Sequence, residues 1–175
     1  QMVKPNFKVK AGHEVIVFSE DHPDSNDIIP EPMDLNIVFE DDDVLLINKP
    51  AGMVVHPGSG NPNGTLVNGV AHYLMQQNPE LTEFNLPRFG LVHRIDKNTS
   101  GLLLLAKTDR ALQHLAKQFF NHTIDRKYVA LVWGDVEEDS GTIEAHVGRS
   151  PRYRKQFEAF PEGEYGKHAI THYNV

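Results

Sequence analysis

The sequence has no cysteine and only one tryptophan among its 175 residues. The lack of cysteine excludes disulfides and thiolate metal sites within these residues. No apolar run approaches the ~18 residues of a membrane-spanning helix, so we expect no membrane partner. Apolar residues make up 39% of the chain and charged residues 23%, which is typical of one globular domain with a sizeable core. A cytoplasmic location is the simplest expectation.

Positive charge is scarce in the first half of the chain. Residues 1–83 contain 4 Lys and Arg against 13 Asp and Glu, whereas residues 84–175 contain 13 against 11. The net charge of −7 argues against a nucleic-acid partner, but the uneven distribution allows the second half to present one basic face. Scattered, solvated cations are the alternative.

The most informative segment is His-Arg-Ile-Asp-Lys-Asn-Thr-Ser-Gly at residues 93–101. It places one carboxylate, Asp96, between the cationic side chains of Arg94 and Lys97. Carboxylates are ionised at neutral pH, and neighbouring positive charge favours that form, so the segment favours a nucleophile over a proton donor. The alternative is an ordinary surface ion pair. Arg94 and Asp96 project from the same face of an extended chain, and such a pair contributes about 0 to 1 kcal/mol.

Residues 94–101 resemble the signature of the RluA/RluD-type pseudouridine synthases. That signature reads Arg, an aliphatic residue, Asp, Lys, a variable position, Thr, Ser or Thr, and Gly, and it leads into an apolar strand. Other segments resemble further motifs of the family in the family's order. They are residues 47–58, 126–134, 148–149, 154–155 and 166–173. The resemblance covers about residues 36–175.

The resemblance implies an isomerase that converts uridine in RNA to pseudouridine, with Asp96 as the catalytic nucleophile. Attack could occur at the ribose C1′ or at C6 of the uracil ring, and neither route needs a redox cofactor, a metal or a nucleotide. Tyr128 would face the base flipped out of its stack. Arg94, Lys97 and Arg126 would contact phosphates or hold the loop around Asp96.

The RNA substrate is less well defined than the reaction. Residues 55–62 look most like the D-type branch, which modifies large-subunit ribosomal RNA, and transfer RNA is the alternative. A noncatalytic RNA-binding or ribosome-assembly protein could use the same basic face. The ten histidines suggest a metal hydrolase as another alternative. However, they do not group as ligands, and His168 and His172 on one strand would lie about 13 Å apart. We expect RNA as partner, no metal, and a monomer.

Three regions are expected along the chain. Residues 1–18 look like the tail of an S4-type RNA-binding domain, residues 19–35 like an acidic, proline-containing linker, and residues 36–175 like the catalytic domain. The family's later Gly-Arg-x-His-Gln-Ile-Arg-type motif, which supplies a basic partner to the carboxylate, does not occur before Val175. We therefore expect a catalytic domain truncated at its C-terminal end, with poor activity.

Apolar periodicity predicts helices after Thr65 and after the candidate caps Thr108 and Asp109. Strands are predicted at residues 37–40, 44–48, 102–106, 127–133, 141–147, 155–160 and 168–175. This order predicts an α+β fold with a mixed, largely antiparallel sheet flanked by helices and loops.

Some aromatic residues and cations have more than one interpretation. Phe119, Phe120 and Trp133 are expected in the core. The structural alternative for Tyr128 is a half-buried strand tyrosine. Lys49 and His56 could shape the same face as Asp96 or serve the fold alone.

Overall fold

The structure is a computed structural model, and it describes residues 10, 12, 28–58, 60–78, 86–153, 156–161 and 165–175. The chain divides into two compact units, Gln1–Asp125 and Arg126–Val175, and each is described by itself. The tail expected at residues 1–18 lies outside the described residues apart from Lys10 and Gly12, so that domain assignment stays a prediction.

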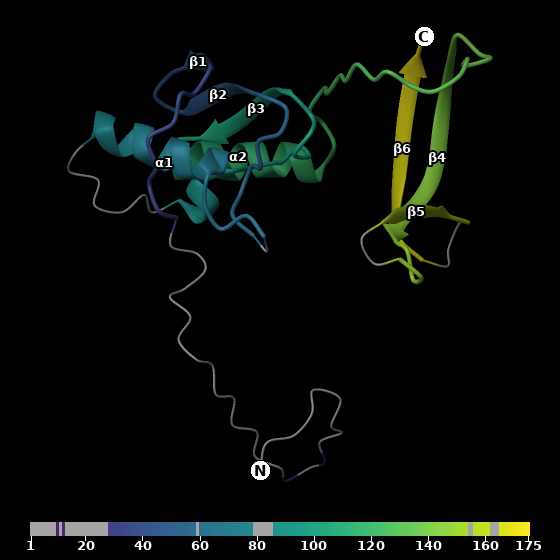
Figure 1. The fold of residues 1–175 in the computed structure, drawn as a ribbon, viewed down its shortest axis with the longest axis horizontal. Coiled ribbons are helices and arrows are strands. Elements are labelled where there is room, and N and C mark those ends of the chain that lie inside the picture. The colour runs from purple at the N-terminus through teal and green to yellow at the C-terminus, as the bar shows by residue number, and fades with distance from the viewer. Residues whose placement is uncertain are drawn as a thin grey trace. The chain divides into compact units, whose positions relative to one another are not determined.

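The first unit is built on a three-stranded antiparallel sheet with the order β1-β2-β3 (Figure 1). Its strands are β1 (Ile37–Glu40), β2 (Val44–Lys49) and β3 (Gly101–Ala106). β2 and β3 pair over their whole length, from Val44 opposite Ala106 to Lys49 opposite Gly101. Because the strands run in opposite directions, the loop that follows β2 and the loop that precedes β3 lie at the same end of the sheet.

Helix α1 (Leu66–Gln77) packs on the inner face of this sheet. Its N-terminus is capped by Thr65, whose backbone N–H donates to the Asn68 side chain at 3.0 Å. The main core combines leucine, isoleucine and valine side chains from the helix, β2, β3 and the loop after β2: Leu45, Ile47, Val55, Leu66, Val70, Leu74, Leu103 and Leu105. Each such side chain contributes about 1.5–3 kcal/mol when fully buried.

Helix α2 (Asp109–Phe120) begins at the predicted cap, since the Thr108 hydroxyl accepts from the Ala111 N–H at 3.2 Å. Phe119 is half-buried, but Phe120 is 83% exposed, so the prediction that both belong to the core is wrong for Phe120. Consecutive residues of a helix point about 100° apart, and a narrow contact with the sheet accommodates only one of them. No helix in the described ranges is both long and apolar enough to span a membrane.

The described part of the stretch expected as a linker, residues 28–35, is attached to α1. Ile28 is buried against Val67 and Ala71. The Glu31 N–H donates to the Asn68 carbonyl at 3.0 Å, and the Asn68 side-chain amide donates to the Ile29 carbonyl at 2.8 Å. Residues 28–31 therefore lie against the helix in fixed register.

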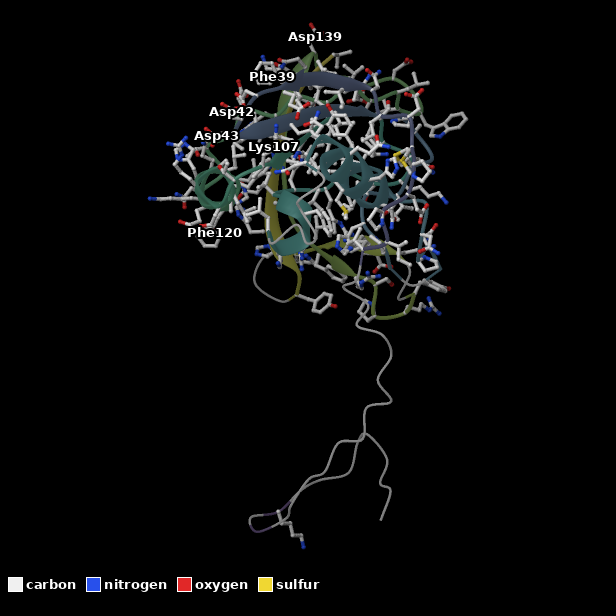
Figure 2. All side chains as sticks on the ribbon, turned by 90° about the vertical axis from the view of Figure 1, so that its left-hand side faces the viewer. Phe39, Asp42, Asp43, Lys107, Phe120 and Asp139 are labelled. Atoms are coloured by element: carbon white, nitrogen blue, oxygen red, sulfur yellow. The ribbon has the colours of Figure 1, made fainter. Side chains whose placement is uncertain are left out.

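The turn between β1 and β2 is acidic, and its side chains bond within the turn and to the start of α2. The Asp41 carboxylate accepts the backbone N–H of Asp43 at 2.9 Å, which closes the turn. Lys107 pairs with Glu40 and Arg110 with Asp43, each at 2.7 Å. Figure 2 shows Asp43 and Lys107 on the same side of the unit. These acidic side chains therefore have structural partners.

The second unit is an antiparallel sheet with the order β5-β4-β6, formed by β4 (Ser140–Arg149), β5 (Phe157–Phe160) and β6 (Lys167–Asn174). β5 pairs only with the C-terminal end of β4, whereas β6 pairs with most of it. Among the described residues of this unit, only Gly148 and Ser150 are buried. Neither face of the sheet therefore has a hydrophobic core of its own within the described part.

The strand predicted at residues 127–133 is wrong. The structure assigns no strand to any of residues 126–139, and Val129, Leu131 and Trp133 are fully exposed. Trp133 is therefore not a core residue, and Tyr128, which is 62% exposed, is not a half-buried strand tyrosine. A strand needs a neighbour for its backbone hydrogen bonds. The α+β class is confirmed, because the described ranges contain both helices and antiparallel sheets.

Candidate active site

Asp96 occupies the first position of a tight turn that precedes β3. Its backbone carbonyl accepts the Thr99 N–H at 3.1 Å, which closes the turn over residues 96–99. The side chains of Asp96, Lys97 and Asn98 are exposed. The turn therefore presents the carboxylate to solvent at the end of a paired, rigid strand.

A second loop holds this turn in place. The Gly52 N–H, from the loop after β2, donates to the Lys97 carbonyl at 2.8 Å. Gly52 has a φ of +86°, in the left-handed region where glycine is favoured because it lacks a Cβ. The residue following Asp96 is thus fixed to the neighbouring loop through its backbone.

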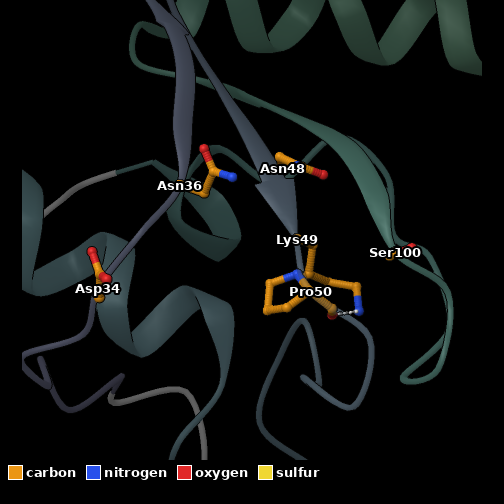
Figure 3. Close-up of a pocket in the computed structure, with 6 residues that line it drawn as sticks. All are labelled: Asp34, Asn36, Asn48, Lys49, Pro50 and Ser100. Atoms are coloured by element: carbon orange, nitrogen blue, oxygen red, sulfur yellow. Dashed lines mark hydrogen bonds between the residues drawn. The ribbon is translucent and has the colours of Figure 1, made fainter.

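Lys49 makes the same connection with its side chain. Its ammonium nitrogen donates to the carbonyls of Pro50 at 2.9 Å, Met53 at 2.9 Å and Lys97 at 3.1 Å, and the bond to Pro50 is drawn in Figure 3. An ammonium group has three N–H donors, so all are used. The side chain is fully buried. Burial lowers the pKa of Lys49 below its ordinary value, while the negative charge of Asp96 acts to raise it.

The surface ion pair between Arg94 and Asp96 does not form. Both side chains are exposed, as is that of Lys97, and no ion pair within the described ranges includes Asp96. Between two exposed side chains such a pair gains little free energy, which agrees with its absence. Within the described residues the Asp96 carboxylate therefore forms no ion pair, although the charge of Lys49 acts on it.

His93, which the sequence arguments did not single out, fixes the start of the motif. Its Nε2 accepts the Leu104 N–H at 3.0 Å, and its ring stacks on Phe119 with centroids 4.5 Å apart. Since Nε2 accepts a hydrogen bond, a neutral ring carries its proton on Nδ1. His93 thus links the segment before Asp96 to both β3 and α2. The signal in the sequence that could have indicated this role is the position of His93, three residues before Asp96.

A left-handed turn delivers the chain to this segment. Arg88, Phe89 and Gly90 all have positive φ, of 52°, 54° and 72°. A Cβ on Gly90 would lie 1.8 Å from the Ala106 carbonyl oxygen, so only glycine permits the close approach to β3. The next residue, Leu91, then forms a bridge with Leu105.

An open pocket of about 550 Å³ lies at the end of β2 (Figure 3). It is lined by Asp34, Asn36, Asn48, Lys49, Pro50 and Ser100. None of the residues predicted for the catalytic site lines this pocket. The pocket adjoins the segment that holds Asp96 through Ser100. Lys49 lines the pocket and also donates to the Lys97 carbonyl of that segment. The exposed carboxylate therefore defines the candidate site better than the pocket does.

The structure places Arg94 and Lys97 on one loop with Asp96. Tyr128 and Arg126 belong to the second unit, and both are exposed. Their roles toward a base or phosphate stay predictions. His56, which the sequence left open, is half-buried, and its Nδ1 lies 3.0 Å from the Pro57 carbonyl.

Two histidines of β6 have partners of their own. His168 pairs with Glu144 at 2.7 Å, and the Nδ1 of His172 lies 2.8 Å from the Thr142 hydroxyl. Within the part of the chain that the structure describes, no three histidine or acidic side chains gather as a metal-binding group. The metal-hydrolase interpretation therefore gains no support from the described residues.

A turn that exposes one carboxylate at the end of an antiparallel strand pair, in an α+β fold, fits the class of enzymes that the motif at residues 93–101 indicates. The family described as RNA pseudouridylate synthase matches residues 43–175. The chain therefore belongs to the RNA pseudouridylate synthase family, which confirms the resemblance found in the sequence.

Individual relatives agree. The chain is 47% identical to an uncharacterized RNA pseudouridine synthase of Bacillus subtilis, over 99% of this chain and 55% of the relative. It is 43% identical to ribosomal large subunit pseudouridine synthase D of Neisseria meningitidis serogroup B, over 98% of this chain and 44% of the relative. The corresponding Escherichia coli K12 protein is 38% identical, over 98% and 49%.

The fold agrees as well. The solved structure of human RNA pseudouridylate synthase domain containing 1 superposes with a TM-score of 0.57 at 25% identity, covering 81% of this chain and 53% of the human chain. The chain thus spans about half the length of the relatives that it matches.

Proposed function

We propose that the protein is an RNA pseudouridine synthase that isomerises uridine in large-subunit ribosomal RNA, with Asp96 as its nucleophile. The observation that carries this proposal is the exposed Asp96 carboxylate, free of ion pairs within the described ranges, on a turn tied to the neighbouring loop. A carboxylate that takes part in no ion pair keeps its lone pairs for attack, and a turn fixed by backbone hydrogen bonds reduces the entropy lost on reaching the reactive geometry.

The reaction rearranges bonds without changing composition. The bond between N1 of uracil and C1′ of ribose breaks, the base turns, and a bond between C5 and C1′ forms. The proton lost from C5 is matched by the proton gained at N1, so no oxidant or reductant takes part. Asp96 attacks either C1′, with oxocarbenium-like charge development, or C6 of the ring. In both routes the carboxylate is released at the end.

The target uridine must leave its stack before Asp96 can reach it, which is easiest in RNA loops and bulges. Arg94 and Lys97 flank Asp96 on the exposed loop, where they would bind the phosphates on either side of the flipped nucleotide. In this proposal Arg126 adds a further phosphate contact, and the Tyr128 ring, 62% exposed, offers a surface for the base.

Large-subunit ribosomal RNA is proposed because the relatives from Neisseria and Escherichia carry that substrate in their names. Bacterial ribosomal RNA is modified in the cytoplasm, so we propose that location too. Transfer RNA is the competing substrate, and a noncatalytic RNA-binding protein is the competing function.

Release of tritium from RNA labelled at C5 of uridine tests the proposal, because the reaction removes that hydrogen. The full-length protein is incubated with 23S-type ribosomal RNA or with transfer RNA, and each RNA is isolated from a strain that lacks this protein. Release from ribosomal RNA alone is expected. Release from transfer RNA alone would contradict the substrate, and binding to RNA without any release would contradict the enzymatic function.

A further inference from the structure

The pocket at the end of β2 has polar walls from three segments of the chain (Figure 3). Asp34 and Asn36 lie in the segment before β1. Asn48 lies on β2, and Ser100 directly precedes β3. Within the described residues, none of these four side chains forms a hydrogen bond or an ion pair. Their donors and acceptors are therefore available to a bound molecule.

The wall that carries Asp34 and Asn36 is held against the first unit. The Asn48 N–H donates to the Asn36 carbonyl at 2.9 Å, and the Leu35 side chain packs against the main core. Asp34 and Asn36 are exposed whereas Leu35 is half-buried, as in an extended segment whose alternate side chains point to opposite sides. The packing of Leu35 therefore fixes the direction in which its two polar neighbours point.

The lining groups favour a nucleobase over a phosphate. The volume of about 550 Å³ lies within the range of about 300–1,000 Å³ that is usual for ligand sites. The Asp34 carboxylate repels a phosphate group. The only cation among the described lining residues is Lys49, whose three N–H donors are all used on backbone carbonyls.

Among the bases of RNA, adenine fits these groups best. An asparagine amide pairs with adenine through two hydrogen bonds, one from the N6 amino group and one to N7. The pocket offers two asparagines, and the Asp34 carboxylate is an acceptor for the second N6 hydrogen. Guanine is read at O6 and N7 by arginine or lysine, and the described lining has no such donor to spare.

The pocket lies close to Asp96. The turn at residues 96–99 is closed by a hydrogen bond, and Ser100 follows it directly. The Cα atoms at the two ends of such a turn lie within about 7 Å, and one more residue adds about 3.8 Å, so the Ser100 and Asp96 Cα atoms lie within about 11 Å. One or two nucleotides of an unstacked strand span this distance.

We infer that this pocket binds the base of an adenosine that lies one or two nucleotides from the uridine at Asp96, with Asn48 and Asp34 bound to its N6 amino group. The inference rests on the proposed function and adds part of its substrate sequence. Asn48 is named because it lies on the strand that pairs with β3, opposite Leu102. Contacts to phosphates position RNA, whereas contacts to bases specify its sequence, so the pocket selects uridines that have an adenosine nearby.

A change of one group in the RNA tests the inference without altering the protein. The uridines that the full-length protein converts in isolated RNA are mapped, and a short stem-loop around one of them is synthesised. Each adenosine within two nucleotides is replaced in turn by purine riboside, which lacks the N6 amino group. At one position kcat/KM should fall by at least about tenfold. Unchanged kcat/KM at every position, or a converted uridine with no adenosine within two nucleotides, would overturn the inference.

Protein variants assign this loss to the pocket. In Asn48→Ala the amide is already absent, so the same purine riboside should lower kcat/KM by less than about twofold. Asn78→Ala is the matched control and should keep the tenfold loss. Asn78 is an exposed asparagine at the far end of α1, about 18 Å along the helix from its first residue. Asp34→Ala, with the same expected insensitivity, replaces Asn48→Ala if that variant does not fold.

Failure of the inference can be told from failure of the proposed function. A tenfold loss that persists in the pocket variant contradicts the inference alone, because the protein still converts uridine. If the unaltered protein converts no uridine in any RNA, the proposed function fails, and the inference falls with it.

Discussion

Replacing Glu40 by glutamine should destabilise the first unit measurably. One carboxylate oxygen accepts from the Lys107 ammonium at 2.7 Å, and the other accepts from the Tyr73 hydroxyl at 2.6 Å. The Glu40 and Lys107 side chains are only 18% and 20% exposed. Glutamine keeps the shape but removes the charge, and it presents an amide group to one of the two donors.

The size of the effect follows from this partial burial. Hydrogen bonds to charged groups contribute about 1.5–3 kcal/mol, whereas exposed ion pairs contribute about 0–1 kcal/mol. Lys107 retains one acceptor, the Asp41 carbonyl at 2.7 Å, so a loss of about 2 kcal/mol is expected. At about 2–4 °C per kcal/mol, the melting temperature should fall by about 4–8 °C.

The loss should also depend on pH. Burial acts to raise the pKa of the Glu40 carboxyl, but hydrogen bonds from Lys107 and Tyr73 and the charge of Lys107 outweigh it, so its pKa lies below the ordinary 4.5. A pKa lowered by folding contributes stability that is present above pH 4.5 and is lost as the pH falls through the folded-state value. The difference between Glu40→Gln and the unaltered protein should therefore shrink in acid.

Urea unfolding followed by circular dichroism, at about pH 7 and about pH 3, measures both effects. Asp42→Asn is the matched control, because Asp42 is an exposed carboxylate in the same turn (Figure 2) and should change stability by less than about 0.5 kcal/mol. The reasoning is refuted if both variants lose equally little at neutral pH, or if the Glu40→Gln loss is as large in acid.

Two further outcomes test the fold. Gly90→Ala should lower the free energy of unfolding by more than about 3 kcal/mol, because its Cβ would meet the Ala106 carbonyl at 1.8 Å. Gly60→Ala, with φ of +83° and open space around it, should lower it by about 1–2 kcal/mol. Equal losses in urea unfolding would contradict the close approach at Gly90. Trp133, the single tryptophan of this chain, should show the emission maximum and acrylamide quenching of a free indole in this 175-residue chain, and a blue-shifted, protected signal would contradict its exposure.

Elements with local signals were predictable from the sequence. The continuous apolar run of β3 and the helical spacing that follows Thr65 and Thr108 depend on side chains within one segment. β1 begins and ends where predicted. These patterns also located the two loops that meet at the Asp96 end of the sheet.

Features that depend on distant partners were not predictable in this way. The pattern at residues 127–133 favours a strand, but a strand exists only beside another, and local sequence cannot supply the neighbour. Lys49 was left open for the same reason, since its third acceptor lies 48 positions away. The Arg94 and Asp96 pair does not form because both side chains are exposed, where such a pair gains little free energy.

The central claim, that the Asp96 carboxylate is the nucleophile of a pseudouridine synthase, is tested most directly by Asp96→Asn in the full-length protein. The substitution keeps the shape of the side chain and removes its charge, and Asp42→Asn serves as the control for loss of an exposed acid. Asp96→Asn should reduce tritium release from C5-labelled ribosomal RNA by at least about a thousandfold while RNA affinity stays within about twofold. Turnover that persists in Asp96→Asn at the rate of Asp42→Asn would contradict the claim.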